Sequence, residues 1–425
     1  MKLHHQIFIA MALGGLCGYF TDSTTAVFGI ELLDAYDMIG ALFIQALQML
    51  VVPLITSALI SSLVNIGEGG GLGRLGGKTL LYFMLSTLVA VLIGLLVANV
   101  LQPGIINGKP AGELLGLAEN THDVLAQIEG RSAGDFSTIL LQLVPANLLD
   151  AASQGQMLGL ISFSLLFGYF LRQVNGAPGD NLRNTMIGLY DTMVRITMFI
   201  IRFTPIGVFG LIAATMTRTG LQSLQPLAWF VLAVTSGLAL HAFVLLPLAV
   251  KLFAKRSPVL HMRVMTPALL TAFSTASSAA TLPVTMECME NKGGLSKRVS
   301  SFVLPLGSTI NMNGSALYEC MVVLFIAQAS GVELSLAAQF IVLVTAVITS
   351  IGVASIPAAS LLAITLILSI VGLPPESIGL ILVTDRILDM CRTTVNIWSD
   401  SVGAVLIARS EGEQGVLQPQ PEASV

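Results

Sequence analysis

The sequence is poor in charge. Only 10% of its 425 residues are Asp, Glu, Lys or Arg, against about 25% in an ordinary soluble domain, and 54% are hydrophobic. So few charges cannot cover a water-exposed surface, and the composition therefore predicts a membrane protein. The net charge of −4 comes without any basic run, so nucleic acid is not an expected partner.

Motifs for redox, metal or enzymatic chemistry are also missing. The four cysteines (Cys17, Cys288, Cys320 and Cys391) contain no CxxC spacing, and their apolar neighbours indicate buried thiols rather than disulfides or a metal site. The five histidines form no HExxH motif, and no GxSxG occurs; these are the patterns that an intramembrane hydrolase would need. We predict that the protein is not an enzyme.

Long apolar stretches are the main feature that is present. Candidate membrane spans lie at 3–20, 37–66, 79–103, 155–174, 186–213, 222–253, 299–330 and 376–409, each about as long as a bilayer requires or longer. No small-residue cleavage site follows the first stretch, which favours a membrane helix over a signal peptide. Residues 136–150 are ambiguous and could add a short helix.

Two further apolar stretches, 259–290 and 334–372, are interrupted by small and polar residues. Segment 21–37 is acidic, whereas 67–78 and 251–256 carry Lys and Arg, so the first loop is predicted outside and the other two inside. A single crossing by either interrupted stretch would then put a cationic loop outside. We therefore predict an all-α, multi-pass protein with eight transmembrane helices, two re-entrant helical hairpins and cytoplasmic termini.

A weak internal repeat supports the two hairpins. Ala280-Thr281-Leu282-Pro283 resembles Ala354-Ser355-Ile356-Pro357, and each proline precedes a polar membrane residue, Asn311 or Asp385, by 28 positions. Inverted repeats with broken helices are typical of secondary transporters that bind substrate near the middle of the membrane.

One polar stripe runs through the last apolar stretch: Asp385, Asp389, Arg392, Asn396 and Asp400. On a helix these spacings place all five side chains on one face. Ionisable groups at membrane depth usually mark a substrate or ion pathway, although a structural ion-pair network is the alternative. Asp389 with Arg392 would match the ammonium and a carboxylate of an amino acid.

Two other polar groups have a dual interpretation. The run Asn311-Met312-Asn313-Gly314-Ser315 lies inside 299–330, where an opened helix could bind sodium or the amides could merely support a kink. The hydroxyls of Ser274, Thr275, Ser277 and Ser278 lie at the expected tip of the first hairpin; they could cap two helix ends or bind a carboxylate at a helix N-terminus.

These motifs carry a family resemblance that covers nearly the whole chain. The run from Asp385 to Asn396, together with Asn311–Gly314 and Ser277–Pro283, resembles the glutamate transporter homologue family of dicarboxylate/amino acid:cation symporters, in particular its bacterial proton/sodium-coupled glutamate/aspartate members. The resemblance implies a homotrimer in the cell inner membrane. It also implies an elevator mechanism, with scaffold helices in 1–78 and 104–222, an extracellular loop in the latter, a transport domain formed by 79–103 and 223–411, and a disordered cytoplasmic tail at 412–425.

The resemblance also implies site residues. The substrate set would be Ser277, Ser278, Ser315, Ile356, Pro357, Asp389, Arg392, Thr393 and Asn396. Within it Asp389 would bind the amine, Arg392 the side-chain carboxylate, and Asn396 with Ser315 the α-carboxylate, while 352–358 would be the gate. One sodium site would comprise Gly307, Asn311, Asn396 and Asp400, and a second Thr309, Met312, Ser350 and Ile351.

A third sodium site departs from the family pattern. Asn313 stands where an Asp is common and Phe83 where a Tyr is common, leaving Ser86, Thr87 and Asn311 as the remaining ligands. The loss of one carboxylate and one phenol oxygen weakens this site, so protons could replace sodium as a coupling ion.

The predicted function is import of aspartate or glutamate coupled to sodium or proton entry. A C4-dicarboxylate carrier would have little use for Asp389, and a neutral amino acid carrier little use for Arg392. Both remain alternatives of the same fold, as does an anion channel.

Overall fold

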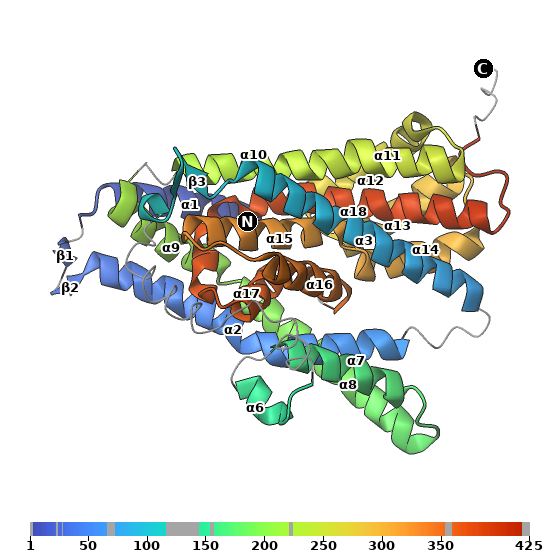
Figure 1. The fold of residues 1–425 in the computed structure, drawn as a ribbon, viewed down its shortest axis with the longest axis horizontal. Helices are drawn as coiled ribbons and strands as arrows, with labels where there is room; N and C mark the ends of the chain where they lie inside the picture. The colour runs from blue at the N-terminus through green and yellow to red at the C-terminus, as the bar shows by residue number, and fades with distance from the viewer. Residues whose placement is uncertain are drawn as a thin grey trace.

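The computed structural model describes residues 3–22, 24–27, 29–65, 73–115, 144–153, 157–220, 224–352 and 359–418. Over these residues the chain is mostly helical (Figure 1), as the all-α prediction requires. The strands in these ranges are two short antiparallel ribbons, β1 (Ala26–Val27) with β2 (Ile30–Glu31) and β3 (Ile105–Ile106) with β4 (Lys109–Pro110).

The described helices come in a fixed order along the chain. Their bounds are α1 (Leu3–Tyr19), α2 (Leu32–Asn65), α3 (Gly73–Leu101), η1 (Glu113–Leu115), α6 (Leu148–Ser153), α7 (Met157–Leu171), α8 (Ala177–Ile201), α9 (Thr204–Thr219), α10 (Leu224–Leu240), η3 (His241–Leu245), α11 (Leu246–Ala249), η4 (Val250–Ala254), α12 (Pro258–Thr275), α13 (Ser278–Glu287), η5 (Cys288–Lys292), α14 (Lys297–Ile310), α15 (Asn313–Ala329), α16 (Leu336–Gly352), α17 (Ala359–Val371), η6 (Pro375–Leu380) and α18 (Leu382–Ser410).

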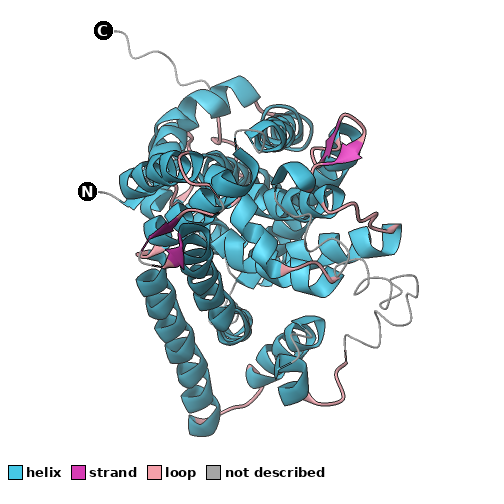
Figure 2. Ribbon diagram, turned by 90° about the vertical axis from the view of Figure 1, so that its left-hand side faces the viewer, coloured by secondary structure: helices cyan, strands magenta, loops and turns pink. Residues whose placement is uncertain are grey.

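The helices pack as two groups (Figures 1 and 2). In the first, α2 lies against α7, α8 and α9, and α9 also lies against α1. In the second, α15 is enclosed by α3, α10, α16, α17 and α18, and α12 and α14 complete the enclosure of α18. Contacts between the groups come mainly from α16, α17 and η6 against α2 and α9. The almost wholly buried α15 forms the centre of the second group.

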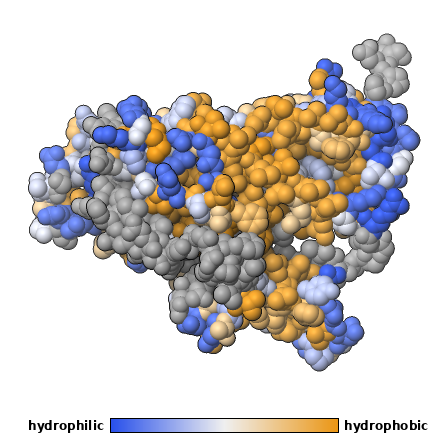
Figure 3. Space-filling model, viewed as in Figure 1, coloured by the Kyte–Doolittle hydropathy of each residue, from blue (hydrophilic) through white to orange (hydrophobic). Residues whose placement is uncertain are grey.

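On the face seen in Figure 3, a broad apolar band lies between two polar ends. Within the described ranges, four helical stretches have the length and apolarity to cross a bilayer, namely Leu32–Ser61, Arg74–Leu101, Leu224–Ala254 and Lys297–Ala329. The pair formed by α8 and α9, bent by 51°, makes a fifth. The number of eight crossings stays a prediction, because α1 and α7 are shorter apolar helices and the charged stripe lowers the hydropathy of α18.

The stretch predicted as one span at 186–213 is two helices in the structure. Helix α8 begins earlier, at Ala177, and the chain turns at Arg202 and Phe203 before α9. Pro205, in the first turn of α9, has no N–H to bond to the preceding turn, which explains the break at this position.

Both interrupted stretches fold as helix pairs. In the first, α12 and α13 pack together, and the chain turns at Ala276, whose φ is +49°, before Ser277. In the second, α16 packs against α17. The connecting residues 353–358, which include the predicted gate and its Ile356 and Pro357, lie outside the described residues.

The first residues after α18 pack against the polar end of the second group. Lys78 of α3 donates to Glu411 at 2.5 Å, and Glu413 accepts from the Ser296 N–H at 3.1 Å at the start of α14. The Leu417 N–H donates to the Gly293 carbonyl at 2.8 Å. Residues 411–418 therefore link the ends of α3, α14 and the first helix pair; the assignment of 412–425 as a cytoplasmic tail stays a prediction.

Candidate substrate and cation site

The predicted polar stripe lies on one continuous helix, α18, as expected. Its central residue, Arg392, is fully buried. The guanidinium lies 3.9 Å from the centre of the Tyr318 ring of α15, and its Nη2 donates to Asp385 at 3.1 Å and to Asp389 at 3.0 Å. The Tyr318 hydroxyl also donates to Asp385 at 3.1 Å. Ring and carboxylates together fix the guanidinium, because a planar cation favours both kinds of contact.

Most of the Arg392 donors are nevertheless free. Its Nε and Nη1 are buried and have no hydrogen-bond partner among the described residues. An unpaired buried donor is costly, so an anionic group that accepts from Nε or Nη1 would be stabilised here. Asp389, held also by Arg386 at 3.5 Å, provides an acceptor for an ammonium group.

The predicted opening between α14 and α15 is present. Asn311 and Met312 leave the helical conformation, with ψ of 75° and 55°. Asn396 of α18 lies against this opening: its Oδ1 accepts from the Gly314 N–H at 2.8 Å and its Nδ2 lies 3.3 Å from Ser315 Oγ. The amide thereby caps the start of α15 and brings together two residues predicted to bind the α-carboxylate.

The residues predicted for the first sodium site partly converge. Asn311 Nδ2 donates to Asp400 Oδ1 at 2.8 Å, and a Cβ on Gly307 would lie 2.7 Å from the same oxygen. Asp400 Oδ2 is buried without a hydrogen-bond partner in the described part of the chain. A buried, unsatisfied carboxylate oxygen next to an opened helix fits a hard cation. Asn396 lies one helical turn away on α18.

The residues predicted for the third sodium site also lie together. Ser86 donates to Asn311 Oδ1 at 3.2 Å and Thr87 to Asn313 Oδ1 at 2.9 Å. Phe83 is buried beside them. The residue before Phe83, Tyr82, does have a phenol oxygen near these residues: its hydroxyl donates to the Ser399 carbonyl at 3.1 Å.

The second predicted sodium site is less assembled. Thr309 is exposed and bonds back to its own helix, and the hydroxyl of buried Ser350 does the same. Met312 instead accepts from Asn396 Nδ2 at 3.1 Å. Among described residues no hydrogen bond joins Thr309 to Ser350, and Ile351 lies at the end of α16 with its side chain outside the description.

At the first hairpin tip, the capping interpretation accounts for part of the hydroxyl cluster. Ser277 caps α13 by accepting from the Ala280 N–H at 3.3 Å, and the hydroxyls of Ser274 and Thr275 bond to carbonyls of α12. Ser278 is buried at the start of α13. Thr393 is likewise buried, next to Arg392 on α18.

Several polar residues of the site were not predicted. Ser399 accepts from both Asn311 and Asn313, at 3.0 and 2.7 Å; its position three residues after Asn396 continues the 4-3-4 spacing of the stripe. Glu319, a buried carboxylate that accepts from Thr349 at 3.2 Å, could have been noticed because it is the acidic residue within 299–330.

His241 was also missed, because a lone histidine in an apolar run gives no pattern. It is the first residue of the π-helical turn η3, which directly follows α10, and Asn313 Nδ2 lies 3.2 Å from its Nε2. Pro247 has no N–H for the carbonyl four residues before it, which is a local reason for the irregular turn.

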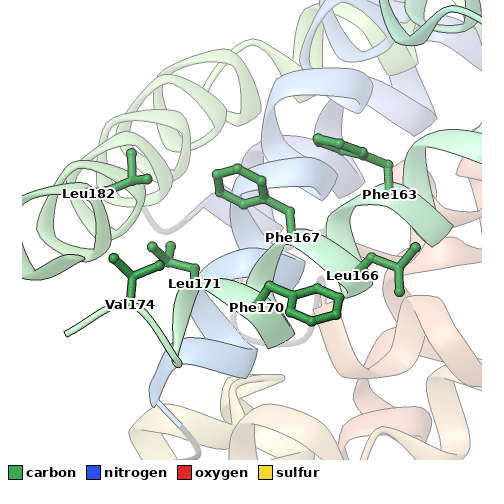
Figure 4. A pocket seen from close by; sticks show the side chains of 7 residues that line it. All are labelled: Phe163, Leu166, Phe167, Phe170, Leu171, Val174 and Leu182. Atoms are coloured by element: carbon green, nitrogen blue, oxygen red, sulfur yellow. The ribbon is translucent and has the colours of Figure 1, made fainter. Parts of the chain in front are cut away.

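A pocket between α7 and α8 has a different character (Figure 4). It is lined by apolar side chains only, namely Phe163, Leu166, Phe167, Phe170, Leu171, Val174 and Leu182. With no charged or hydrogen-bonding side chain in its lining, it does not fit a charged substrate. The polar cluster of α14, α15 and α18 is therefore the candidate site.

Broken apolar helices around buried charges define a membrane transporter rather than an enzyme. The model of the sodium:dicarboxylate symporter family matches residues 3–410, and the chain belongs to this family. It is 34% identical over 413 residues to the proton/sodium-glutamate symport protein of Bacillus caldotenax, with 96% of this chain and 94% of the relative covered.

Other relatives carry related names. The chain is 35% identical over 415 residues to the proton/glutamate-aspartate symporter of Escherichia coli (strain K12), covering 96% of this chain and 93% of the relative. It is 33% identical over 412 residues to the human neutral amino acid transporter B(0), covering 89% and 74%. Membership of the family confirms the resemblance found in the motifs.

Proposed function

We propose that this protein is a secondary active symporter that imports aspartate or glutamate together with sodium ions or protons. The observation that carries the proposal is the buried guanidinium of Arg392, fixed through Nη2 but with Nε and Nη1 unpaired within the described ranges. An acidic amino acid supplies a carboxylate for these donors and an ammonium for Asp389. The names of the two bacterial relatives support the same substrate class.

The remaining substrate contacts follow from the start of α15. Asn396 and Ser315 lie 3.3 Å apart and can donate to the α-carboxylate once the substrate separates them. Ser277, Ser278 and Thr393 complete this set, with the segment containing Ile356 and Pro357 as the gate over it. An acidic substrate thus spans from the α15 N-terminus to Arg392.

Sodium is assigned to the oxygen cluster of Gly307, Asn311, Asn396 and Asp400. Asp400 Oδ2, which has no hydrogen-bond partner in the part of the chain that the structure describes, supports this assignment because a cation would compensate the buried charge. Thr309, Met312, Ser350 and Ile351 would form a second site after α16 and its following loop rearrange. These ions enter with the substrate as cargo.

Glu319 is the group we assign to proton coupling. It is buried, it accepts from the Thr349 hydroxyl, and no ion pair to it occurs among the described residues. An unpaired carboxylate at this depth favours its neutral form. Its position one residue after Tyr318, which contacts Arg392, allows proton binding to affect the substrate site.

The transport movement is proposed to be of the elevator type. The second helix group, with α3, would be the transport domain (79–103 and 223–411), and the first group the scaffold (1–78 and 104–222). The limited contacts between the groups support this division. The scaffold would assemble as a homotrimer in the cell inner membrane, with both termini in the cytoplasm, as the resemblance to the family implies.

The test is uptake of labelled aspartate into proteoliposomes with sodium and proton gradients imposed separately. A symporter accumulates aspartate under at least one gradient and exchanges labelled for unlabelled substrate, whereas an anion channel does neither. Competition by succinate alone would indicate a C4-dicarboxylate carrier, and competition by neutral amino acids alone a neutral carrier. Either result would refute the acidic amino acid assignment.

A further inference from the structure

The polar cluster around Asn313 is complete without a cation. The Thr87 hydroxyl donates to its Oδ1 at 2.9 Å, while its Nδ2 lies 2.7 Å from Ser399 Oγ and 3.2 Å from His241 Nε2. All four side chains are buried. The amide oxygen has a donor and both amide hydrogens have acceptors, so the Asn313 amide is satisfied and neutral, while the Nδ1 of His241 has no hydrogen-bond partner among the described residues.

Reversing the amide does not change this conclusion. The Oδ1 would then face Ser399 and His241, whose tautomer with hydrogen on Nε2 is a donor, and the Nδ2 would face Thr87. In either orientation an N–H group points into the cluster. The Asn313 cluster contains no carboxylate, and in either orientation its amide turns an N–H group toward the other polar atoms, so the cluster disfavours a cation.

The Asp400 cluster has the opposite properties. It contains a carboxylate, one of whose oxygens has no partner in the described residues, and the other oxygen can approach the backbone of Gly307 because this residue has no side chain. Asn311 connects the two clusters, because its Nδ2 donates to Ser399 Oγ at 3.0 Å and to Asp400 Oδ1 at 2.8 Å. The clusters are therefore buried neighbours that differ at their centres: the Asn313 amide is neutral and satisfied, whereas Asp400 is a carboxylate with one oxygen unpaired among the described residues.

We propose that His241 determines how many cations accompany the substrate, by pairing with Asn313 to form a hydrogen-bonded unit that excludes a cation. This inference rests on the proposed symport function and deepens it. His241 is a specificity-determining residue rather than a ligand. A carboxylate at position 313 is not enough to create a cation site here, because His241 can donate its Nε2–H to that carboxylate. A cation site forms at position 313 only when Asn313 is replaced by aspartate and the imidazole of His241 is removed as well.

The experiment is a double-mutant comparison of Asn313→Asp, His241→Ser and the combined variant. The number of sodium ions per aspartate is obtained from the voltage at which labelled aspartate has no net flux across proteoliposomes with a fixed sodium gradient. We expect the wild type and both single variants to have the same number, and the combined variant to gain an additional sodium ion.

A matched control keeps the hydrogen bond without the imidazole. In Asn313→Asp with His241→Gln, the glutamine amide still donates to the carboxylate, so the wild-type number is expected. A gain in Asn313→Asp alone, in His241→Ser alone or in this control, or no gain in the combined variant, would overturn the proposal.

A binding measurement separates this inference from the proposed function. Trp398 is adjacent to Ser399, and its Nε1 donates to the Ala242 carbonyl at 2.9 Å, so its fluorescence should report on the cluster. In purified protein with Trp229→Phe, sodium chloride is titrated against choline chloride without substrate. The combined variant should show an additional sodium-binding step that the wild type and the glutamine control lack, and its absence would refute the inference even if a variant does not transport. If the wild type does not take up aspartate, the proposed function fails, whereas this titration still tests His241.

Discussion

Replacing Arg392 by lysine keeps a positive charge in the site but removes the planar fork of nitrogen donors. In the structure Asp385 and Asp389 already share one nitrogen of the guanidinium, at 3.1 and 3.0 Å. The compact ammonium of a lysine would be held by these two carboxylates and would have little left for a substrate carboxylate.

The expected loss follows from the hydrogen bonds that the substrate would no longer receive. A hydrogen bond to a charged group contributes about 1.5–3 kcal/mol, so losing about two gives about 3–6 kcal/mol. Because about 1.4 kcal/mol corresponds to a factor of ten, the KM for aspartate should rise roughly 10²- to 10⁴-fold. Replacement by cysteine should abolish uptake of acidic amino acids and allow neutral ones.

The assay is the initial rate of labelled aspartate uptake into proteoliposomes across a range of aspartate concentrations. Arg386→Lys is the matched control, because Arg386 is partly exposed and lies 3.5 Å from Asp389. An ion pair of this kind contributes up to about 1 kcal/mol, so the control should change KM by no more than about fivefold. If Arg392→Lys stayed within that range as well, Arg392 would not bind the substrate carboxylate.

Three further substitutions test other parts of the molecule. Ser399→Ala should leave one N–H of each of two buried amides, Asn311 and Asn313, without an acceptor and lower the unfolding free energy by roughly 2–6 kcal/mol. Ser401→Ala, which removes only a bond to its own helix, should cost less than about 1 kcal/mol, and scanning fluorimetry in detergent compares the two variants. Glu319→Gln should make uptake insensitive to an imposed proton gradient while sodium-driven uptake persists, and continued proton-driven uptake would exclude Glu319 as the proton carrier. The hydrogen bond from Lys78 lowers the pKa of Glu411, so this contact stabilises the protein at pH values above the ordinary carboxyl pKa and is lost as the pH falls through the lowered pKa. Glu411→Gln should therefore remove part of the decrease of Tm at acid pH. If the profile of Tm against pH is the same in the variant, the contact does not contribute to stability.

The sequence was informative wherever a polar residue interrupts an apolar run. The stripe on α18, the opening at Asn311 and Met312, and both helix pairs were predicted because charge or amide groups at membrane depth require partners. Such a requirement can be recognised without knowing the partner. The division into mobile and fixed domains and the assembly into a trimer remain predictions, since they concern movements and copies beyond one chain.

The sequence was least informative about which groups meet. Ser399, Tyr318 and His241 come from three different helices, and each is unremarkable in its own segment. Their importance arises from the packing of α15 against α18 and of α10 against both. Periodicity within a helix cannot give the rotation of one helix relative to another, nor the π-helical turn that begins at His241. For the same reason the sequence predicts the contact of Arg392 with Asp389 on its own helix but does not predict its contact with the ring of Tyr318.

Asn396 connects the substrate end of the site to its cation end. It lies one turn of α18 from both Arg392 and Asp400, and it bonds the N–H of Gly314 at 2.8 Å. Gly314 permits this contact, because a Cβ there would lie 2.7 Å from the Arg392 carbonyl oxygen. A cation that binds groups in the opening before α15 would therefore bind the same backbone segment that Asn396 contacts, and this segment also packs against Arg392. Coupling between two such sites is typically about 1–3 kcal/mol and is reciprocal, so the factor by which sodium tightens aspartate binding should equal the factor by which aspartate tightens sodium binding.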